Sequence, residues 1–346
     1  MQIGIDSFVP IALDASTRDP MAGADRVSDL LAEIELADQV GLDVFGIGEH
    51  HRPEFIASAP AILLAAAAAR TARIRLASAV TVLSSDDPVR VFQQFATVDL
   101  ISRGRAEIIV GRGSFIESYP LFGYDLEHYD ELFAEKLDLL LKIREQTQVH
   151  WSGTHRAALT GQGVYPRPVQ QPLPVWIGVG GTPQSVVRAG KLGLPLMVAI
   201  IGGEARRFRP LVDLYRETGQ RAGHSPEQLT VGIHSIGFLA DTTEQAVEAF
   251  YPTYMETFTR IGRERGWPPV TRAQFDAARG PRGALLVGDA DTVAEKIIAT
   301  NEALGGIQRM TIQLSTGATA HRTMRRAIEL LGTRVAPAVN KEVAAV

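Results

Sequence analysis

The sequence predicts an α/β fold, a single (β/α)8 TIM barrel with insertions, because short β-branched runs alternate with helical patterns along the chain. Alternation of this kind requires parallel strands with helices packed outside them. The eight predicted strands span residues 3–8, 44–48, 75–80, 106–110, 175–179, 196–200, 231–238 and 310–314.

The connections between these runs support the same fold. Between the first two strands, apolar residues keep a helical stripe that ends at Gly41, a residue type favoured just past a helix. An open, doubly wound sheet would give the same periodicity and remains the alternative. Its dinucleotide-binding pattern G-x-G-x-x-G is missing, since Ile116 and Pro183 stand where the third glycine would follow Gly111 and Gly178.

We expect one domain over residues 1–346, since no stretch resembles a linker. Two long connections, about 114–174 and 239–308, are predicted to be insertions into the barrel. A C-terminal tail, about 335–346, is rich in Ala and Val without a clear stripe, and we expect it to fray.

Composition excludes several classes of function. The chain has 346 residues and a net charge of −4, which favours neither a nucleic-acid partner nor an anionic membrane surface. The absence of cysteine excludes disulfides, thiolate zinc sites and a thiol nucleophile. The longest apolar run, 59–69, is far shorter than the roughly 18 residues of a membrane span, and no secretory signal is evident. We therefore expect a cytoplasmic protein.

A carboxylate and two imidazoles follow the second predicted strand, at Glu49-His50-His51. Neighbouring strand residues point to opposite faces, so the two histidines could share a metal ion only across a sharp turn, and we expect no metal. TIM-barrel active sites lie at the C-terminal ends of strands. An imidazole there can move a proton near neutral pH, and Glu49 is expected to orient it. A polar loop without function is the other interpretation.

Two further strand ends carry groups suited to an anion. Gly180-Gly181 lets backbone approach a ligand, and Thr182 is a natural N-cap for a helix whose free N–H groups and dipole would bind a phosphate. Arg112, between two glycines, offers a planar guanidinium to a phosphate or carboxylate. An ordinary strand-to-helix turn and a surface salt bridge are the alternatives. With His50, these ends predict a phosphorylated cofactor whose reactive ring lies near the imidazole.

A longer pattern connects the same strand ends. It runs from Glu49-His50-His51 through Pro-Val-Arg at 88–90 and Ser-Arg-Gly-Arg at 102–105 to Arg-Gly at 112–113, an aromatic at 115 and Phe-Gly at 122–123. Weaker matches at 193–195 and 287–288 extend it over nearly the whole chain. This pattern resembles that of the bacterial luciferase-like flavin-dependent oxidoreductases.

The resemblance implies a (β/α)8 barrel that binds flavin mononucleotide (FMN) at the strand C-termini. It implies that His50 is the catalytic histidine, that Glu49 is the adjacent acid, and that a non-prolyl cis peptide at Ala79–Val80 lies beneath the flavin ring. The cofactor-binding residues that it implies are Ala79, Val80, Thr81, Gly111, Arg112, Gly180, Gly181 and Thr182. Light-emitting members have a cysteine in place of Gly111 and a tryptophan after the sixth strand, so light emission is not expected here.

The resemblance also implies a reaction. We expect a two-component monooxygenase in which reduced FMN, supplied by a separate flavin reductase, and dioxygen oxidise a small organic substrate. The Arg-rich segment 251–283 matches the family's mobile lid, with a solvated charged face as its alternative, and segment 59–69 suits a homodimer packed through early helices. A deazaflavin-dependent hydride-transfer oxidoreductase and a flavin-binding protein without turnover are the main alternatives, and a metal hydrolase is a remote third.

Overall fold

A computed structural model describes residues 1–12, 19–113 and 115–344 of the chain. Within them, eight parallel strands close into a barrel, because the last strand pairs with the first. The barrel strands, in order around the ring, are β1 (Gln2–Ser7), β2 (Val44–Ile47), β3 (Arg75–Ser78), β5 (Ala106–Gly111), β8 (Val175–Val179), β9 (Leu196–Ala199), β10 (Val231–Leu239) and β12 (Arg309–Gln313). The predicted barrel is confirmed, and each predicted strand is present.

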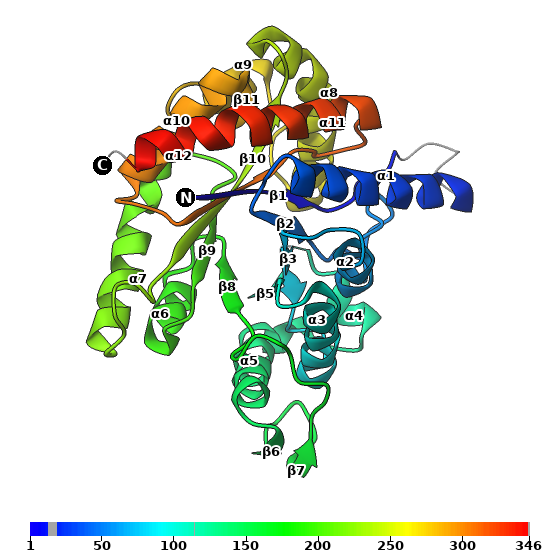
Figure 1. Ribbon diagram of the computed structural model, residues 1–346, viewed down its shortest axis with the longest axis vertical. Helices are drawn as coiled ribbons and strands as arrows, with labels where there is room; N and C mark the ends of the chain where they lie inside the picture. Colours follow the sequence, from blue (N-terminus) through cyan, green and yellow to red (C-terminus); the bar gives the residue numbers. More distant parts are fainter. Residues whose placement is uncertain (13–18, 114, 345–346) are drawn as a thin grey trace.

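A helix follows each strand on the outside of the barrel (Figure 1). These helices are α1 (Pro20–Gln39), α2 (Pro60–Ala68), α3 (Pro88–Ser102), α5 (Tyr129–Glu145), α6 (Pro183–Leu192), α7 (Arg209–Arg221), α10 (Ala290–Ala303) and α11 (His321–Leu330). The first ends where its stripe predicts, since Gly41 follows with φ of 84°. None of the described helices is long and apolar enough to cross a membrane.

The remaining elements lie in the connections between the barrel strands and helices or follow the last helix. They are β4 (Thr81–Val82), α4 (Ser118–Leu121), the 3-10 helix η2 (Leu126–His128), the hairpin β6 (Gln148–Trp151) and β7 (Leu159–Gly163), the 3-10 helix η3 (Ala205–Phe208), α8 (Thr243–Arg265), α9 (Arg272–Arg279), β11 (Leu286–Gly288), the π-helix η4 (Leu331–Val335) and α12 (Ala336–Val343). Figure 1 shows the β6–β7 hairpin beyond α5, on the side of the molecule away from α8 and α9.

Two sequence expectations need adjustment. The connections 114–174 and 239–308 each contain a barrel helix, α5 or α10, besides inserted elements, and residue 114 lies outside the described residues. The expectation of a frayed tail from 335 onward is wrong, because α12 is helical, packs against α10 and buries Ala336 and Val339. Residues 345–346 lie outside the described part.

The interior of the barrel has its own small core. Five strands contribute one side chain each to it: Val44, Ala77, Ile109, Trp176 and Met197. A much larger apolar core lies between the strands and the helices. Because every strand runs in the same direction, the residues that follow each strand meet at one mouth of the barrel.

Candidate active site

His50 lies at this mouth among aromatic rings. Its ring centroid is 4.2 Å from that of Phe8, 4.8 Å from that of Phe55 and 5.2 Å from that of Phe115. Burial lowers the pKa of His50 to about 3, and the neighbouring His51 and Arg52 add to this effect. The imidazole is therefore neutral at neutral pH, and neither ring nitrogen has a hydrogen-bond partner among the described residues.

Glu49 does not orient His50, contrary to the sequence expectation. One of its carboxylate oxygens lies 2.8 Å from Nε2 of His51, and the other accepts a 2.8 Å hydrogen bond from the backbone N–H of Val82. The carboxylate thus ties the loop after β2 to β4. Gly48 explains why this loop can pass so close to the barrel, since a Cβ there would lie 2.4 Å from the ring of Phe8.

A second acid–imidazole pair lies nearby, between residues whose distance along the chain hid it from sequence patterns. Oδ2 of Asp6 on β1 lies 2.7 Å from Nδ1 of His234 on β10, and the hydroxyl of Thr311 on β12 donates to the same oxygen. The other oxygen, Oδ1, is buried with no partner among the described residues. It lies against Gly46, where a Cβ would be 2.1 Å from it. Phe8 contacts both imidazoles, since its ring also stacks on that of His234.

The Ala79–Val80 peptide bond is cis, as the resemblance implied. The Val80 side chain lies against two glycines, since a Cβ on Gly111 or Gly178 would be 2.7 or 2.8 Å from it. A cysteine at position 111 would therefore collide with Val80. Thr81 follows in β4, paired in register with β5. The placement of these residues beneath a flavin stays a prediction.

The structure brings together the residues expected to bind a phosphate. Thr182 is the N-cap of α6, but its hydroxyl does not cap the helix and instead accepts a 3.4 Å hydrogen bond from Nη2 of Arg112. Asp130, at the start of α5, pairs with the other arm of Arg112. Gly181 has φ of 121°, in the region that favours glycine, and the space beside Gly180 is open for at least 4 Å.

A second guanidinium, that of Arg188, lies near these phosphate-binding candidates and was not expected from the sequence. Burial lowers the pKa of Arg188 on α6, and the positive charge of Arg112 lowers it further. Two cations thus lie near one another with Asp130 as their acidic neighbour. Open glycine backbone, a helix N-terminus and a cationic pair suit a phosphate monoester, so these residues fit the FMN phosphate.

The segment expected to be a lid contacts the loop that carries His50. The guanidinium of Arg52 donates to Glu264 near the end of α8, at 2.6 and 2.9 Å, and to Glu117 at 2.7 Å. Arg260 of α8 lies 3.4 Å from Glu54. The end of α8 is therefore fixed to this loop by charged pairs, while its mobility stays a prediction.

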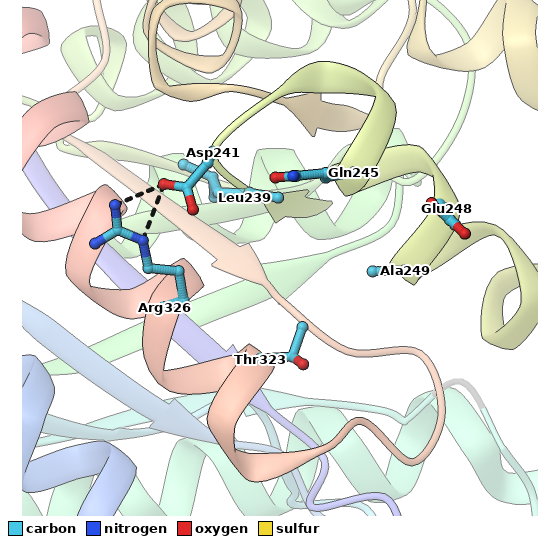
Figure 2. A pocket seen from close by; sticks show the side chains of 8 residues that line it. Leu239, Asp241, Gln245, Glu248, Ala249, Thr323 and Arg326 are labelled. Carbon is cyan, nitrogen blue, oxygen red and sulfur yellow. Dashed lines mark hydrogen bonds and ion pairs between the residues drawn. The ribbon is translucent and has the colours of Figure 1, made fainter.

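Two other features lie apart from these residues. A cavity of about 310 Å³ opens between α8 and α11, beside the Asp241–Arg326 ion pair (Figure 2). None of the expected site residues lines it. Near the start of α5, Glu131 lies 3.2 Å from Nδ1 of His128 and 3.3 Å from Nε2 of His155, a cluster that sequence spacing did not reveal. Two of its three side chains are largely exposed, and we assign no metal to it.

Comparison with known proteins shows which family the chain belongs to. The family model described as luciferase-like monooxygenase matches residues 5–307. The chain belongs to the luciferase-like monooxygenase family. Family membership confirms the predicted resemblance, and with it the expected class of enzyme, an oxidoreductase.

Relatives within the family differ in cofactor. The 4-hydroxyprotoasukamycin monooxygenase of Streptomyces nodosus subsp. asukaensis is 27% identical over 92% of this chain and 89% of its own length. An F420-dependent glucose-6-phosphate dehydrogenase of Beutenbergia cavernae is 30% identical over 66% of this chain and 74% of its own. The structure of the oxygenating constituent of Pseudomonas putida 3,6-diketocamphane monooxygenase, in complex with FMN, matches with a TM-score of 0.76, 22% identity and 98% coverage of each chain.

Proposed function

We propose that the protein is a flavin-dependent monooxygenase that uses reduced FMN and dioxygen to oxidise a small organic substrate. The observation that carries the proposal is the convergence of Arg112 and Thr182 beside the open Gly180-Gly181 turn, at the barrel mouth that also holds His50. Monooxygenases and an FMN-bound protein among the similar proteins support it.

Each part of the mouth has a task in this proposal. Arg112, the hydroxyl of Thr182 and the N–H groups at the start of α6 bind the phosphate. Phe8, Phe55 and Phe115 keep water away from His50, whose neutral imidazole is available as a hydrogen-bonding group. Reduced flavin, when bound, supplies the electrons that activate dioxygen. The contacts of Arg52 with α8 hold this segment over the loop and help to close the site.

A comparison of FMN and riboflavin binding tests the proposed phosphate contact of Arg112. Arg112→Ala is expected to weaken FMN binding about tenfold or more, because a charge-assisted hydrogen bond to the phosphate contributes roughly 1.5–3 kcal/mol. Riboflavin lacks the phosphate, so its affinity should hardly change. Fluorescence titration of wild type, Arg112→Ala and the exposed control Arg322→Ala measures both ligands. Equal losses for FMN and riboflavin in Arg112→Ala would refute this contact.

A second titration separates the main alternative. F420-dependent relatives favour a hydride-transfer oxidoreductase on the same barrel. Stopped-flow spectroscopy with reduced FMN and reduced F420 in parallel, before and after oxygen is admitted, distinguishes the two. Oxygen consumption that rises with candidate aldehydes also separates a monooxygenase from a flavin-binding protein without turnover. His50→Ala should suppress this consumption while it leaves FMN affinity largely intact.

The proposal includes two protein partners and a compartment. A separate flavin reductase would supply reduced FMN, and the reaction would take place in the cytoplasm. A second copy of the chain would pack on a groove of about 430 Å³ between α2 and α3, in which Ile62 is 69% exposed. Light scattering should give twice the monomer mass, and Ile62→Asp should shift it to the monomer. A monomeric wild type would end the proposed dimer.

A further inference from the structure

Asp6 and His234 form a buried pair that the proposed flavin and phosphate contacts do not use. Asp6 is 2% exposed, and three strands converge on its carboxylate, since it meets His234 of β10 and Thr311 of β12. Its Oδ1 has no donor among the described residues, which is costly for a buried charged oxygen. A purely structural role would not require such an arrangement at the mouth of the barrel.

The proposed reaction needs a proton. With the reduced flavin written as its monoanion and the substrate as S, the balance is FMNH⁻ + H⁺ + O2 + S → FMN + SO + H2O. Without substrate it becomes FMNH⁻ + H⁺ + O2 → FMN + H2O2. In both, flavin loses two electrons, dioxygen is reduced and one proton is taken up. His50 is neutral among its aromatic rings, so it carries no extra proton to give at neutral pH.

We propose that His234, positioned by Asp6, donates this proton, an inference that rests on the proposed function. A carboxylate beside an imidazole stabilises its protonated form. Asp6 occupies Nδ1, and Nε2 has no partner among the described residues, so Nε2–H is the donor. The Thr311 hydroxyl fixes the carboxylate. After donation the neutral ring keeps its Nδ1–H bond to Asp6, and its 12% exposed side chain regains a proton from solvent.

Asp6 is the charged side chain that contacts His234 among the neighbours described below. Ala199 of β9 and Thr311 of β12 flank His234 in register, and neither titrates. The Phe8 ring stacks against the imidazole of His234, with 6.3 Å between centroids. Phe8 also contacts His50, which therefore lies beyond the Phe8 ring from His234 in the chain of aromatic contacts. Asp6 is therefore the neighbour whose replacement should disturb the His234 ring most.

Nuclear magnetic resonance of the cofactor-free protein tests the pair without any flavin. Protein labelled with ¹⁵N in its imidazoles is recorded at neutral pH, and the Nδ1 resonance of His234 is followed. Asp6→Asn should shift this resonance, because the carboxylate that accepts the Nδ1–H bond is gone. The control His150→Gln, in the distant β6–β7 hairpin, should leave it unchanged. An unchanged Nδ1 resonance in Asp6→Asn would overturn the pairing.

Reoxidation of bound reduced FMN by dioxygen tests the donor role. The rate is measured from pH 6 to 9 without substrate, with peroxide as the product. His234→Gln should slow it on the order of 10²-fold at neutral pH and weaken its dependence on pH, whereas Asp6→Asn should slow it less and keep FMN affinity. A His234→Gln variant with the same rates as wild type at every pH would refute the donor role. Failure of wild type to bind FMN would instead refute the proposed function, while the resonance result would still decide the pairing.

Discussion

The two ends of the barrel both bury charged side chains, but they treat them differently. At the end where the strands begin, Glu107 accepts from Arg309 at 2.6 and 3.1 Å and also pairs with Arg75. Arg309 further donates to Gln2 and stacks over Trp176. Burial opposes the charge of Glu107, yet the two guanidinium groups hold its pKa below the ordinary value.

At the opposite mouth, the polar groups are left incomplete. Asp6 has one oxygen without a donor. The buried imidazole of His50 makes no hydrogen bond within the described part of the chain. Saturated networks stabilise a fold, whereas unpaired groups at the strand C-termini are available to a ligand. Buried charge alone therefore does not mark an active site, whereas unpaired polar atoms at the strand C-termini point to one.

The largest expected effect is on stability, at the end of the barrel where the strands begin and where Glu107 and Arg309 are fully paired. Arg309→Met leaves Glu107 as a buried charge with a weaker set of partners, so unfolding free energy should fall by about 3–5 kcal/mol. Urea denaturation measures it, and FMN affinity of the folded protein should be unchanged. The double variant Arg309→Met with Glu107→Gln should recover part of the loss. A loss below about 1 kcal/mol would show that this end does not hold the fold.

The next effect concerns pH at the mouth. The unfolded chain binds a proton on His50 near its ordinary pKa of 6.5, while the pKa of the folded state is about 3. The folded state is therefore favoured above pH 6.5, and stability is lost as pH falls, by about 2 kcal/mol at pH 5. Urea titrations at several pH values measure this slope. His50→Gln should reduce it, and an equal slope in both proteins would contradict the buried neutral imidazole.

A smaller effect is expected where Val80 meets the barrel. Gly111→Ala places a methyl group 2.7 Å from the Val80 side chain, so the cis segment must shift. We expect a loss of about 1.5 kcal/mol, typical of overpacking, together with weaker FMN binding. Adding Val80→Ala should restore much of both. If the double variant is no better than Gly111→Ala, the collision is not the cause.

The smallest effect should come from the charged contacts above the mouth. Glu264→Gln removes the outermost pair of Arg52, and since Glu264 is 41% exposed, stability should change by about 1 kcal/mol or less. Amide hydrogen exchange at the end of α8 should nevertheless quicken. Glu217→Gln, which breaks only the exposed pair with Arg221 on α7, is the control. Equal exchange in both variants would show that Arg52 does not hold this segment.

Local patterns predicted much of the fold and only part of the mouth. Strand runs and the Thr182–Pro183 helix start depend on neighbouring residues, so the sequence reveals them. The pairs Asp6–His234 and Glu107–Arg309 join residues 228 and 202 positions apart, and only barrel closure brings them together. Glu49 was assigned to His50 because they are adjacent, yet successive side chains point apart, and its partner is two residues away.

A crystal structure of the protein with FMN tests the proposed cofactor site most directly. We expect the phosphate on Arg112, Thr182 and the Gly180-Gly181 turn, with the ring beside His50. A flavin in the cavity between α8 and α11, or an empty barrel mouth at saturating FMN, would contradict it.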